Sequence, residues 1–128
     1  MRDLAGRMRF LLEVIAAVKQ AVGDDIVVGV RIPNEDYVPE GLAAEDNALI
    51  AAAIDPLADY ISMHMGAYWR FHKLIAPADD PLGVEMAANN LITPNISKPA
   101  MVVGRIMSLD HASAIVERGE ADMVSMVR

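Results

Sequence analysis

Glycine and arginine side chains that could bind an anion recur in the apolar segments of this sequence. Segment 99–106 is a short apolar run that contains Gly104 and Arg105 near its end. Glycine leaves a backbone N–H open to a ligand and arginine supplies a fixed cation, so the pair suits a phosphate group. An earlier apolar run carries Arg31 in a similar sequence, and the chain stops at Arg128. These residues predict an anion site if the fold brings them together.

A second group of reactive side chains lies in the long irregular segment 67–82 and just before it. Tyr68 and His72 lie within this segment, and His64 precedes it. Phenol and imidazole groups serve as proton donors and acceptors in enzymes. A second interpretation stays open, with Tyr68 as a loop aromatic and both histidines as structural or exposed residues. No carboxylate stands at a ligand spacing from the histidines, so no metal is expected.

Predicted helices and strands alternate along the chain. Apolar spacings of three and four predict the helices, and β-branched runs predict the strands. The predicted helices are 8–22, 43–54, 83–93 and 109–118, and the predicted strands are 26–32, 59–66, 99–106 and 121–127. Pro33 is expected to stop the first strand, and Ser108 to cap the last helix before Gly119 ends it. This alternation predicts an α/β fold with a parallel sheet, which binds ligands beyond the carboxyl ends of its strands.

Composition narrows the class of partner. The chain has 128 residues, of which 54% are hydrophobic, enough for one domain with a core. The net charge of −7, from 11 basic and 18 acidic residues, argues against nucleic acid or an anionic membrane as the main partner. There is no cysteine, which excludes disulfides, thiol catalysis and a cysteine-bound iron–sulfur cluster within this chain. A cytoplasmic location is expected, because neither a signal peptide nor an apolar run of roughly 20 residues is found.

Several segments resemble one family, in the family's order. Residues 7–24 resemble the helix before the fifth strand of the old yellow enzyme-like NADH:flavin oxidoreductases, in the branch of 2,4-dienoyl-CoA reductase and trimethylamine dehydrogenase. Residues 29–31, 103–106 and 119–128 resemble the fifth, seventh and eighth strands. The resemblance implies a (β/α)8 TIM barrel with FMN at its C-terminal face. A barrel needs about 250 residues, so residues 1–128 are expected to be the C-terminal half of an FMN-binding domain, with four parallel strands.

The resemblance also implies roles for individual residues in holding FMN. Arg31 would lie at the pyrimidine edge of the flavin and stabilise negative charge on the reduced ring. Gly104 and Arg105 would hold the FMN phosphate, joined by the backbone of Val127 and by Arg128. For Arg31, an ion pair with a neighbouring carboxylate, Glu35 or Asp36, remains an alternative.

The implied activity is that of an FMN-dependent oxidoreductase, of the NADH:flavin oxidoreductase, ene-reductase or amine dehydrogenase type. NAD(P)H or an amine would supply electrons, and Tyr68 would orient a small-molecule substrate or donate a proton. Two alternatives stay open. One is a non-flavin phosphate-binding TIM-barrel enzyme, which would need a catalytic lysine or carboxylate on a strand end. The other is a non-catalytic truncated half-barrel that forms a homo-oligomer through its exposed barrel edges.

Overall fold

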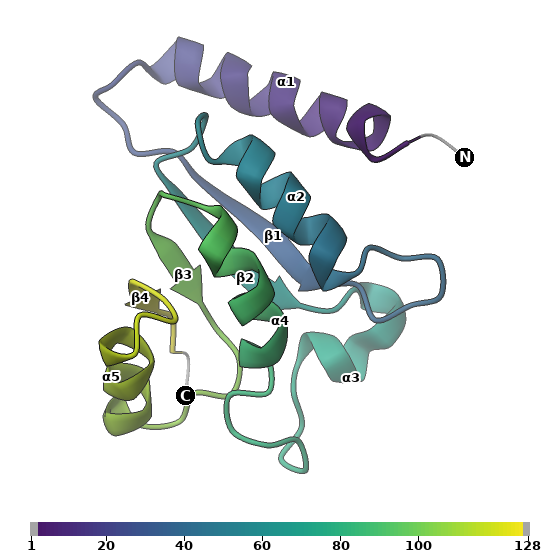
Figure 1. The fold of residues 1–128 in the computed structure, drawn as a ribbon, viewed down its shortest axis with the longest axis vertical. Helices are drawn as coiled ribbons and strands as arrows, with labels where there is room; N and C mark the ends of the chain where they lie inside the picture. The colour runs from purple at the N-terminus through teal and green to yellow at the C-terminus, as the bar shows by residue number, and fades with distance from the viewer. Residues whose placement is uncertain (1–2, 127–128) are drawn as a thin grey trace.

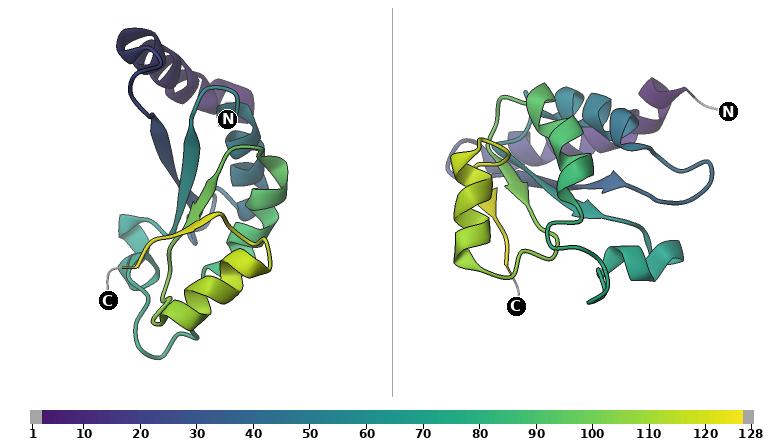
Figure 2. Two further views of the ribbon diagram at one scale, coloured as in Figure 1. Left: turned by 90° about the vertical axis from the view of Figure 1, so that its left-hand side faces the viewer. Right: turned by 60° about the horizontal axis from the view of Figure 1, so that its bottom comes forward.

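The computed structural model describes residues 3–126 and contains a parallel four-stranded sheet with its strands in sequence order. The strands are β1 (Gly29–Glu35), β2 (Tyr60–Met65), β3 (Ala100–Val102) and β4 (Met123–Val124). The helices are α1 (Leu4–Val22), α2 (Ala44–Ile54), α3 (Phe71–Leu74), α4 (Met86–Ile92) and α5 (Leu109–Glu117). Figure 1 shows the arrangement, and the left view of Figure 2 shows α2, α4 and α5 gathered on one side of the sheet. The predicted parallel α/β sheet is confirmed.

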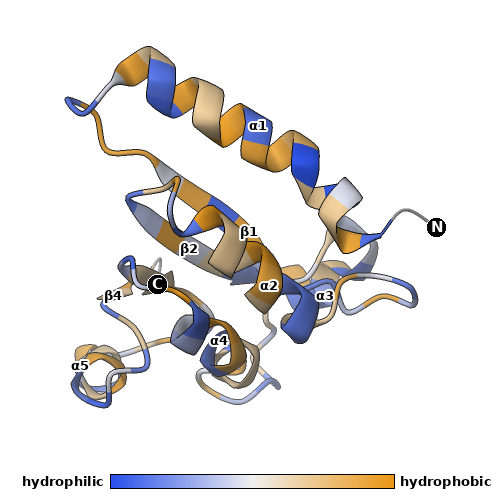
Figure 3. Ribbon diagram, turned by 45° about the horizontal axis from the view of Figure 1, so that its top comes forward, coloured by the Kyte–Doolittle hydropathy of each residue, from blue (hydrophilic) through white to orange (hydrophobic). Residues whose placement is uncertain are grey.

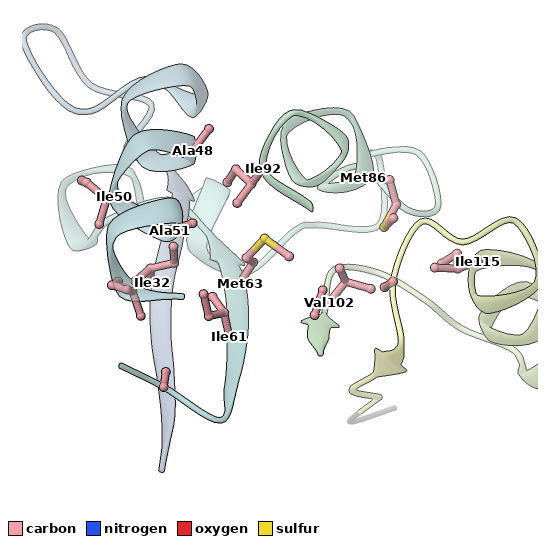
Figure 4. Close-up of a cluster of buried hydrophobic side chains, with 14 of the residues drawn as sticks. Ile32, Ala48, Ile50, Ala51, Ile61, Met63, Met86, Ile92, Val102 and Ile115 are labelled. Carbon is pink, nitrogen blue, oxygen red and sulfur yellow. The ribbon is translucent and has the colours of Figure 1, made fainter. Parts of the chain in front are cut away.

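The hydrophobic core lies between the sheet and these helices. Side chains alternate along each strand, so every second residue points toward the helices. Figure 4 shows Ile32 of β1, Ile61 and Met63 of β2 and Val102 of β3 near Ile92 of α4, and all five are buried. Each such side chain stabilises the fold by roughly 1.5–3 kcal/mol relative to an exposed position. The core therefore holds the helices to one face and leaves the other face available for a site.

Helix α1 begins earlier than predicted, at Leu4 instead of residue 8. Asp3 caps it, because its carboxylate accepts a hydrogen bond of 2.8 Å from the N–H of Gly6. The predicted end is confirmed, since Gly23 follows the last turn with a φ of 66°. Figure 3 shows hydrophobic and hydrophilic bands alternating along α1, as expected for a helix that packs on one side.

The prediction that Pro33 ends the first strand is wrong. The strand starts later than predicted, at Gly29, and continues through Pro33 to Glu35. Within residues 3–126, β1 pairs only with β2 and is an edge strand, where the missing N–H of a proline is tolerated. Strand β3 is shorter than the predicted 99–106, because the backbone turns away soon after Val102.

The segment 67–82, predicted to be irregular, contains a 3₁₀ turn (Tyr68–Arg70) followed directly by α3. These turns are too short to produce an apolar periodicity in the sequence. The helix predicted over 83–93 is also shorter, because α4 begins at Met86. It continues into a second 3₁₀ turn, Thr93–Asn95, which contains a proline.

The cap predicted for α5 is confirmed. The Ser108 hydroxyl accepts a hydrogen bond of 3.2 Å from the N–H of His111, and Gly119 follows the helix with a φ of 69°. No helix within residues 3–126 has the length and apolar composition that crossing a bilayer requires.

Candidate functional site

The sheet face opposite the core carries Arg31 and small or apolar neighbours. The strand register places Arg31 beside Ser62, and Ser62 beside Met101. Because these residues alternate with buried core residues, they face away from α2 and α4. Together with Val103 and Ser125, among others, they line a cavity of about 220 Å³.

Arg31 lies in β1, close to the end of the strand predicted over 26–32 but inside the strand that the structure shows. It is the third residue of β1, so it lies along the strand and not at its carboxyl end. Within residues 3–126 it forms no ion pair, so the alternative of pairing with Glu35 or Asp36 is not found. Arg31 is exposed on the open face of the sheet. Its cation is therefore available to a ligand that lies on this face.

Gly104 and Arg105 form a tight turn directly after β3. Gly104 has a φ of 125° and Arg105 a φ of 49°, so both have left the extended conformation. Such successive positive-φ residues expose backbone N–H groups in a concave arrangement that suits an anion. Within residues 3–126 neither of these two N–H groups donates to another backbone carbonyl. Both N–H groups are therefore without a backbone partner in this part of the structure, and phosphate binding by the turn stays a prediction.

The side chain of Arg105 is held by the loop before α4. Its guanidinium donates a hydrogen bond to the backbone carbonyl of Asp80, and its own carbonyl accepts one of 3.2 Å from Gly83. The ammonium group of Lys73 lies 3.7 Å from the Asp80 carboxylate. The loop after α3 is thus attached to the turn after β3 through Asp80 and Gly83.

A cavity of about 550 Å³ opens beside this turn. Its walls come from the α3–α4 loop, from the turn after β3 and from Ser125 and Met126 after β4. It shares Val103 and Ser125 with the smaller cavity that contains Arg31. An elongated ligand with one anionic end would therefore reach from the Gly104–Arg105 turn to Arg31 along one face. The residues present fit a flavin mononucleotide in this respect.

Glu85 is a site residue that the sequence prediction missed. Its side chain is only 4% exposed, and it lines the larger cavity beside Gly104. Burial raises the pKa of Glu85 to about 8, although the positive charge of Arg31 and a hydrogen bond from the Met65 N–H oppose this rise. In the sequence Glu85 stands at the start of a helix, where an acidic residue is ordinary, so nothing marked it as buried.

A buried asparagine cluster, also missed, connects β1 to α2 and α4. Asn34 lies at an irregularity in β1, between Pro33 and Glu35, where the register with β2 shifts. Its side-chain amide donates to the Asn89 side chain at 2.9 Å, and its backbone carbonyl accepts from the Asn47 side-chain amide at 3.2 Å. Bulges of this kind are common at the carboxyl ends of strands that border active sites.

Tyr68, the predicted catalytic residue, is 81% exposed in the 3₁₀ turn after β2 and lines neither cavity. His72 is also exposed, in α3. His64 is half-buried, and burial lowers its pKa, while its Nδ1 lies 3.3 Å from the carbonyl of Met65. Arg31 and the Gly104–Arg105 turn thus line two cavities that share residues, whereas Tyr68 lines neither of them. The predicted Val127 and Arg128 lie outside the described residues.

Comparison with known proteins matches residues 3–128 to the NADH:flavin oxidoreductase / NADH oxidase family. An N,N-dimethylglycine/sarcosine dehydrogenase from Chromohalobacter salexigens is 34% identical over 130 residues, covering 95% of this chain and 18% of the relative. An NADH oxidase from Thermoanaerobacter brockii is 29% identical over 124 residues, covering 95% of this chain and 19% of the relative. The solved structure of histamine dehydrogenase from Rhizobium sp. 4-9 superposes with a TM-score of 0.87 at 25% identity, covering 100% of this chain and 18% of its own.

The chain spans about a fifth of the length of these relatives. The predicted fold class, four strands of a TIM barrel, is confirmed by the superposition. The family match covers almost the whole chain and the superposition covers all of it, so this chain belongs to the NADH:flavin oxidoreductase / NADH oxidase family.

Proposed function

We propose that this chain forms the phosphate-binding end of the FMN site in a flavin-dependent oxidoreductase. The observation that carries the proposal is the Gly104–Arg105 turn, which faces a cavity of about 550 Å³ at the carboxyl end of β3. Ligands of parallel α/β barrels bind at this end of the strands. Membership in a flavin oxidoreductase family supports FMN as the ligand.

The phosphate would be held by backbone and side chain together. The N–H groups of Gly104 and Arg105 would donate to phosphate oxygens, and the Arg105 guanidinium would supply the countercharge. Val127 and Arg128 follow Met126, which lines the same cavity, and would add a backbone N–H group and a second guanidinium to the phosphate contacts. A phosphate held on several sides in this way would fix the position of the whole cofactor.

When bound, FMN would supply the hydride chemistry, and this chain would supply position and electrostatics. Arg31 would place its positive charge beside the ring system and stabilise negative charge there after reduction. Tyr68 would orient the substrate or donate a proton from the loop after β2. The exposure of its ring leaves the hydroxyl group accessible to a ligand.

The names of the relatives support a choice of electron donor. Two similar proteins are named as dehydrogenases of amines, dimethylglycine or sarcosine in one case and histamine in the other. We therefore propose a small amine as the hydride donor. NAD(P)H is the second candidate donor, and the name of the NADH oxidase relative supports NADH in this role. An activated alkene is the proposed acceptor.

Flavin titration tests the FMN proposal. The chain is titrated with FMN and, separately, with riboflavin, which lacks the phosphate, and binding is followed by flavin absorbance and fluorescence. We expect FMN to bind more tightly than riboflavin. Arg105→Ala should weaken FMN binding about tenfold and leave riboflavin binding unchanged, because a charge-assisted contact to the phosphate is lost.

Arg9→Ala is the matched control, because Arg9 is an exposed arginine on α1 that pairs only with Glu13 at 2.7 Å. It should change neither titration. Equal affinity for FMN and riboflavin, or equal losses in the two arginine variants, would rule out the proposed phosphate site.

Self-association of a non-catalytic half-barrel is the second candidate. Within residues 3–126, β1 and β4 each pair with a single neighbour, and α1 exposes 77% of Phe10. Unpaired strand edges of this kind promote association. Sedimentation at increasing protein concentration tests it, and a chain that stays monomeric while it binds FMN excludes it.

A further inference from the structure

The Glu85 side chain fills the space in which β2 and β3 separate. The two strands pair only at Ile61–Ala100 and Ser62–Met101, although β2 continues to Met65. The backbone of Met65, at the end of β2, lies close enough to the Glu85 carboxyl group to lower its pKa against the effect of burial. The other side of its carboxyl group packs on Gly104, where an added Cβ would lie 2.4 Å from Glu85 Cδ.

This carboxyl group is nearly sealed from solvent and incompletely paired. Glu85 Oε2 is buried without a hydrogen-bond partner within the described part of the chain. A buried carboxylate without full pairing is costly, and protonation removes most of that cost. Figure 1 shows α4, whose first turn Glu85 precedes, beside the chain that leaves β3. The group therefore lies against the Gly104–Arg105 turn and lines the same cavity.

The charged and titratable groups around Glu85 come from three elements. Arg31 on β1 favours its ionised form, whereas burial disfavours it more strongly. Tyr37, in the loop after β1, has its pKa raised by burial and also by the negative charges of Glu35 and Glu85. Arg105 lines the same cavity, but its guanidinium donates to a backbone carbonyl. The neighbouring side chains of Asn34 and Asn89 are neutral amides.

We propose that Glu85 is a positioning residue of the anion site: in its uncharged form it supports the Gly104–Arg105 turn, and loss of its proton places a negative charge beside the turn that weakens phosphate binding. This inference rests on the proposed function, because it assumes that the turn binds a phosphate. It adds a proton-linked residue to that site. Binding of a phosphate dianion would in turn make Glu85 harder to ionise, by reciprocal linkage.

The physical reason is the repulsion between two like charges, the Glu85 carboxylate and the phosphate, that lie beside the same turn. With the pKa of Glu85 at about 8, the group changes from mostly protonated at pH 7 to mostly ionised at pH 9. The phosphate of FMN ionises near pH 6, so its own charge changes little over this range. At an effective dielectric constant of roughly 20 to 40, such repulsion corresponds to a loss of affinity of at least about tenfold.

The test is the affinity for FMN and for riboflavin at about pH 7 and about pH 9, in wild type and in Glu85→Gln. Wild type should bind FMN about tenfold more weakly at the higher pH, whereas riboflavin binding should stay the same. Glu85→Gln keeps the size of the side chain and stays neutral, so its FMN affinity should match wild type at the lower pH and lose the pH dependence. Glu117→Gln, an exposed glutamate at the end of α5, is the matched control and should behave as wild type.

Circular dichroism first verifies that each variant is folded. If Glu85→Gln does not fold, Glu85→Asp is the second variant to test. Glu85→Asp keeps the ionisable group but shortens it, so FMN should bind more weakly at both pH values. Wild type that fails to bind FMN at either pH overturns the proposed function and this inference with it. FMN binding with the same pH dependence in wild type and Glu85→Gln overturns this inference alone, as does an equal pH dependence for riboflavin.

Discussion

The carboxyl group of Glu85 lies in contact with the α-carbon of Gly104. A Cβ atom at position 104 would lie 2.4 Å from Cδ and 2.6 Å from Oε1 of Glu85. Non-bonded carbon atoms pack at about 3.5–4.0 Å, so no side chain fits there without movement. Glu85 and the turn at Gly104 therefore pack directly against each other, and a substitution at either position should disturb the other.

Gly104→Ala should destabilise the chain strongly. Alanine is strained at a φ of 125°, and its methyl group would overlap the buried carboxyl group. We expect a loss of about 3 kcal/mol, from backbone strain and overpacking together. Urea unfolding measures it. Gly119→Ala is the control, because that glycine also has positive φ but has no atom within 4 Å of an added Cβ. It should cost only about 1 kcal/mol, and equal losses would show that the contact with Glu85 is unimportant.

The same carboxyl group should make stability fall as the pH rises from about 4.5 to about 8. Its pKa is about 8 in the folded chain against 4.5 in the unfolded chain, so the folded state holds this proton more tightly. The resulting stabilisation is fully present below pH 4.5 and is lost as pH rises to about 8, by roughly 4 kcal/mol in total. Urea midpoints of wild type should therefore fall across this range, and those of Glu85→Gln should fall much less. Parallel pH profiles for the two proteins would contradict a raised pKa.

The order of the longer helices and of the strands was predictable from the residue pattern of each segment, whereas the short α3 produced no such pattern. The cap of α5 and the end of α1 followed from Ser108 and Gly23, whose local geometry needs no tertiary contact. The predicted end of the first strand at Pro33 was wrong, because the effect of a proline on a strand depends on whether the strand lies at an edge of the sheet. That property belongs to the sheet and cannot be found in the segment alone.

The candidate site was predictable only in part for a similar reason. Gly104 and Arg105 were identifiable because a turn and an anion site both depend on local residue types. Glu85 and Asn34 were not, because their importance comes from burial between elements distant in sequence. The exposure of Tyr68 likewise depends on how the loop after β2 folds. The role given to Tyr68 came from resemblance and stays a prediction.

The buried asparagine cluster should contribute to stability through cooperation between its members. Asn34→Ala removes the donor that lies 2.9 Å from Asn89 Oδ1 and leaves that buried oxygen unpaired. We expect a loss of about 2 kcal/mol. In a double-mutant cycle with Asn89→Ala, the coupling energy should be about 1 kcal/mol. Asn95→Ala, which removes only an exposed bond to a backbone carbonyl, is the control and should change stability little. Additive losses at positions 34 and 89 would show that the two amides act independently.

The amino ends of the strands carry a repeated carboxylate that should make the chain sensitive to acid. Asp59, just before β2, accepts a hydrogen bond of 2.7 Å from the N–H of Val28, and Asp122, just before β4, accepts one of 2.8 Å from Ala100. Each carboxylate thus joins its own strand to the preceding one. The Val28 N–H and Lys19, whose ammonium group lies 2.9 Å away, hold the pKa of Asp59 below its usual value.

Asp59→Asn should therefore lower stability near neutral pH and have little effect in acid. A lowered pKa in the folded state gives stabilisation that is present above the ordinary pKa of 3.8 and is lost as pH falls through the lower folded value. The difference in urea midpoint between wild type and Asp59→Asn should thus shrink as pH falls from about 7 to about 3. Asp25→Asn, in the exposed turn before β1, is the control and should follow wild type throughout. A difference that stays constant with pH would mean that Asp59 acts through its shape and not its charge.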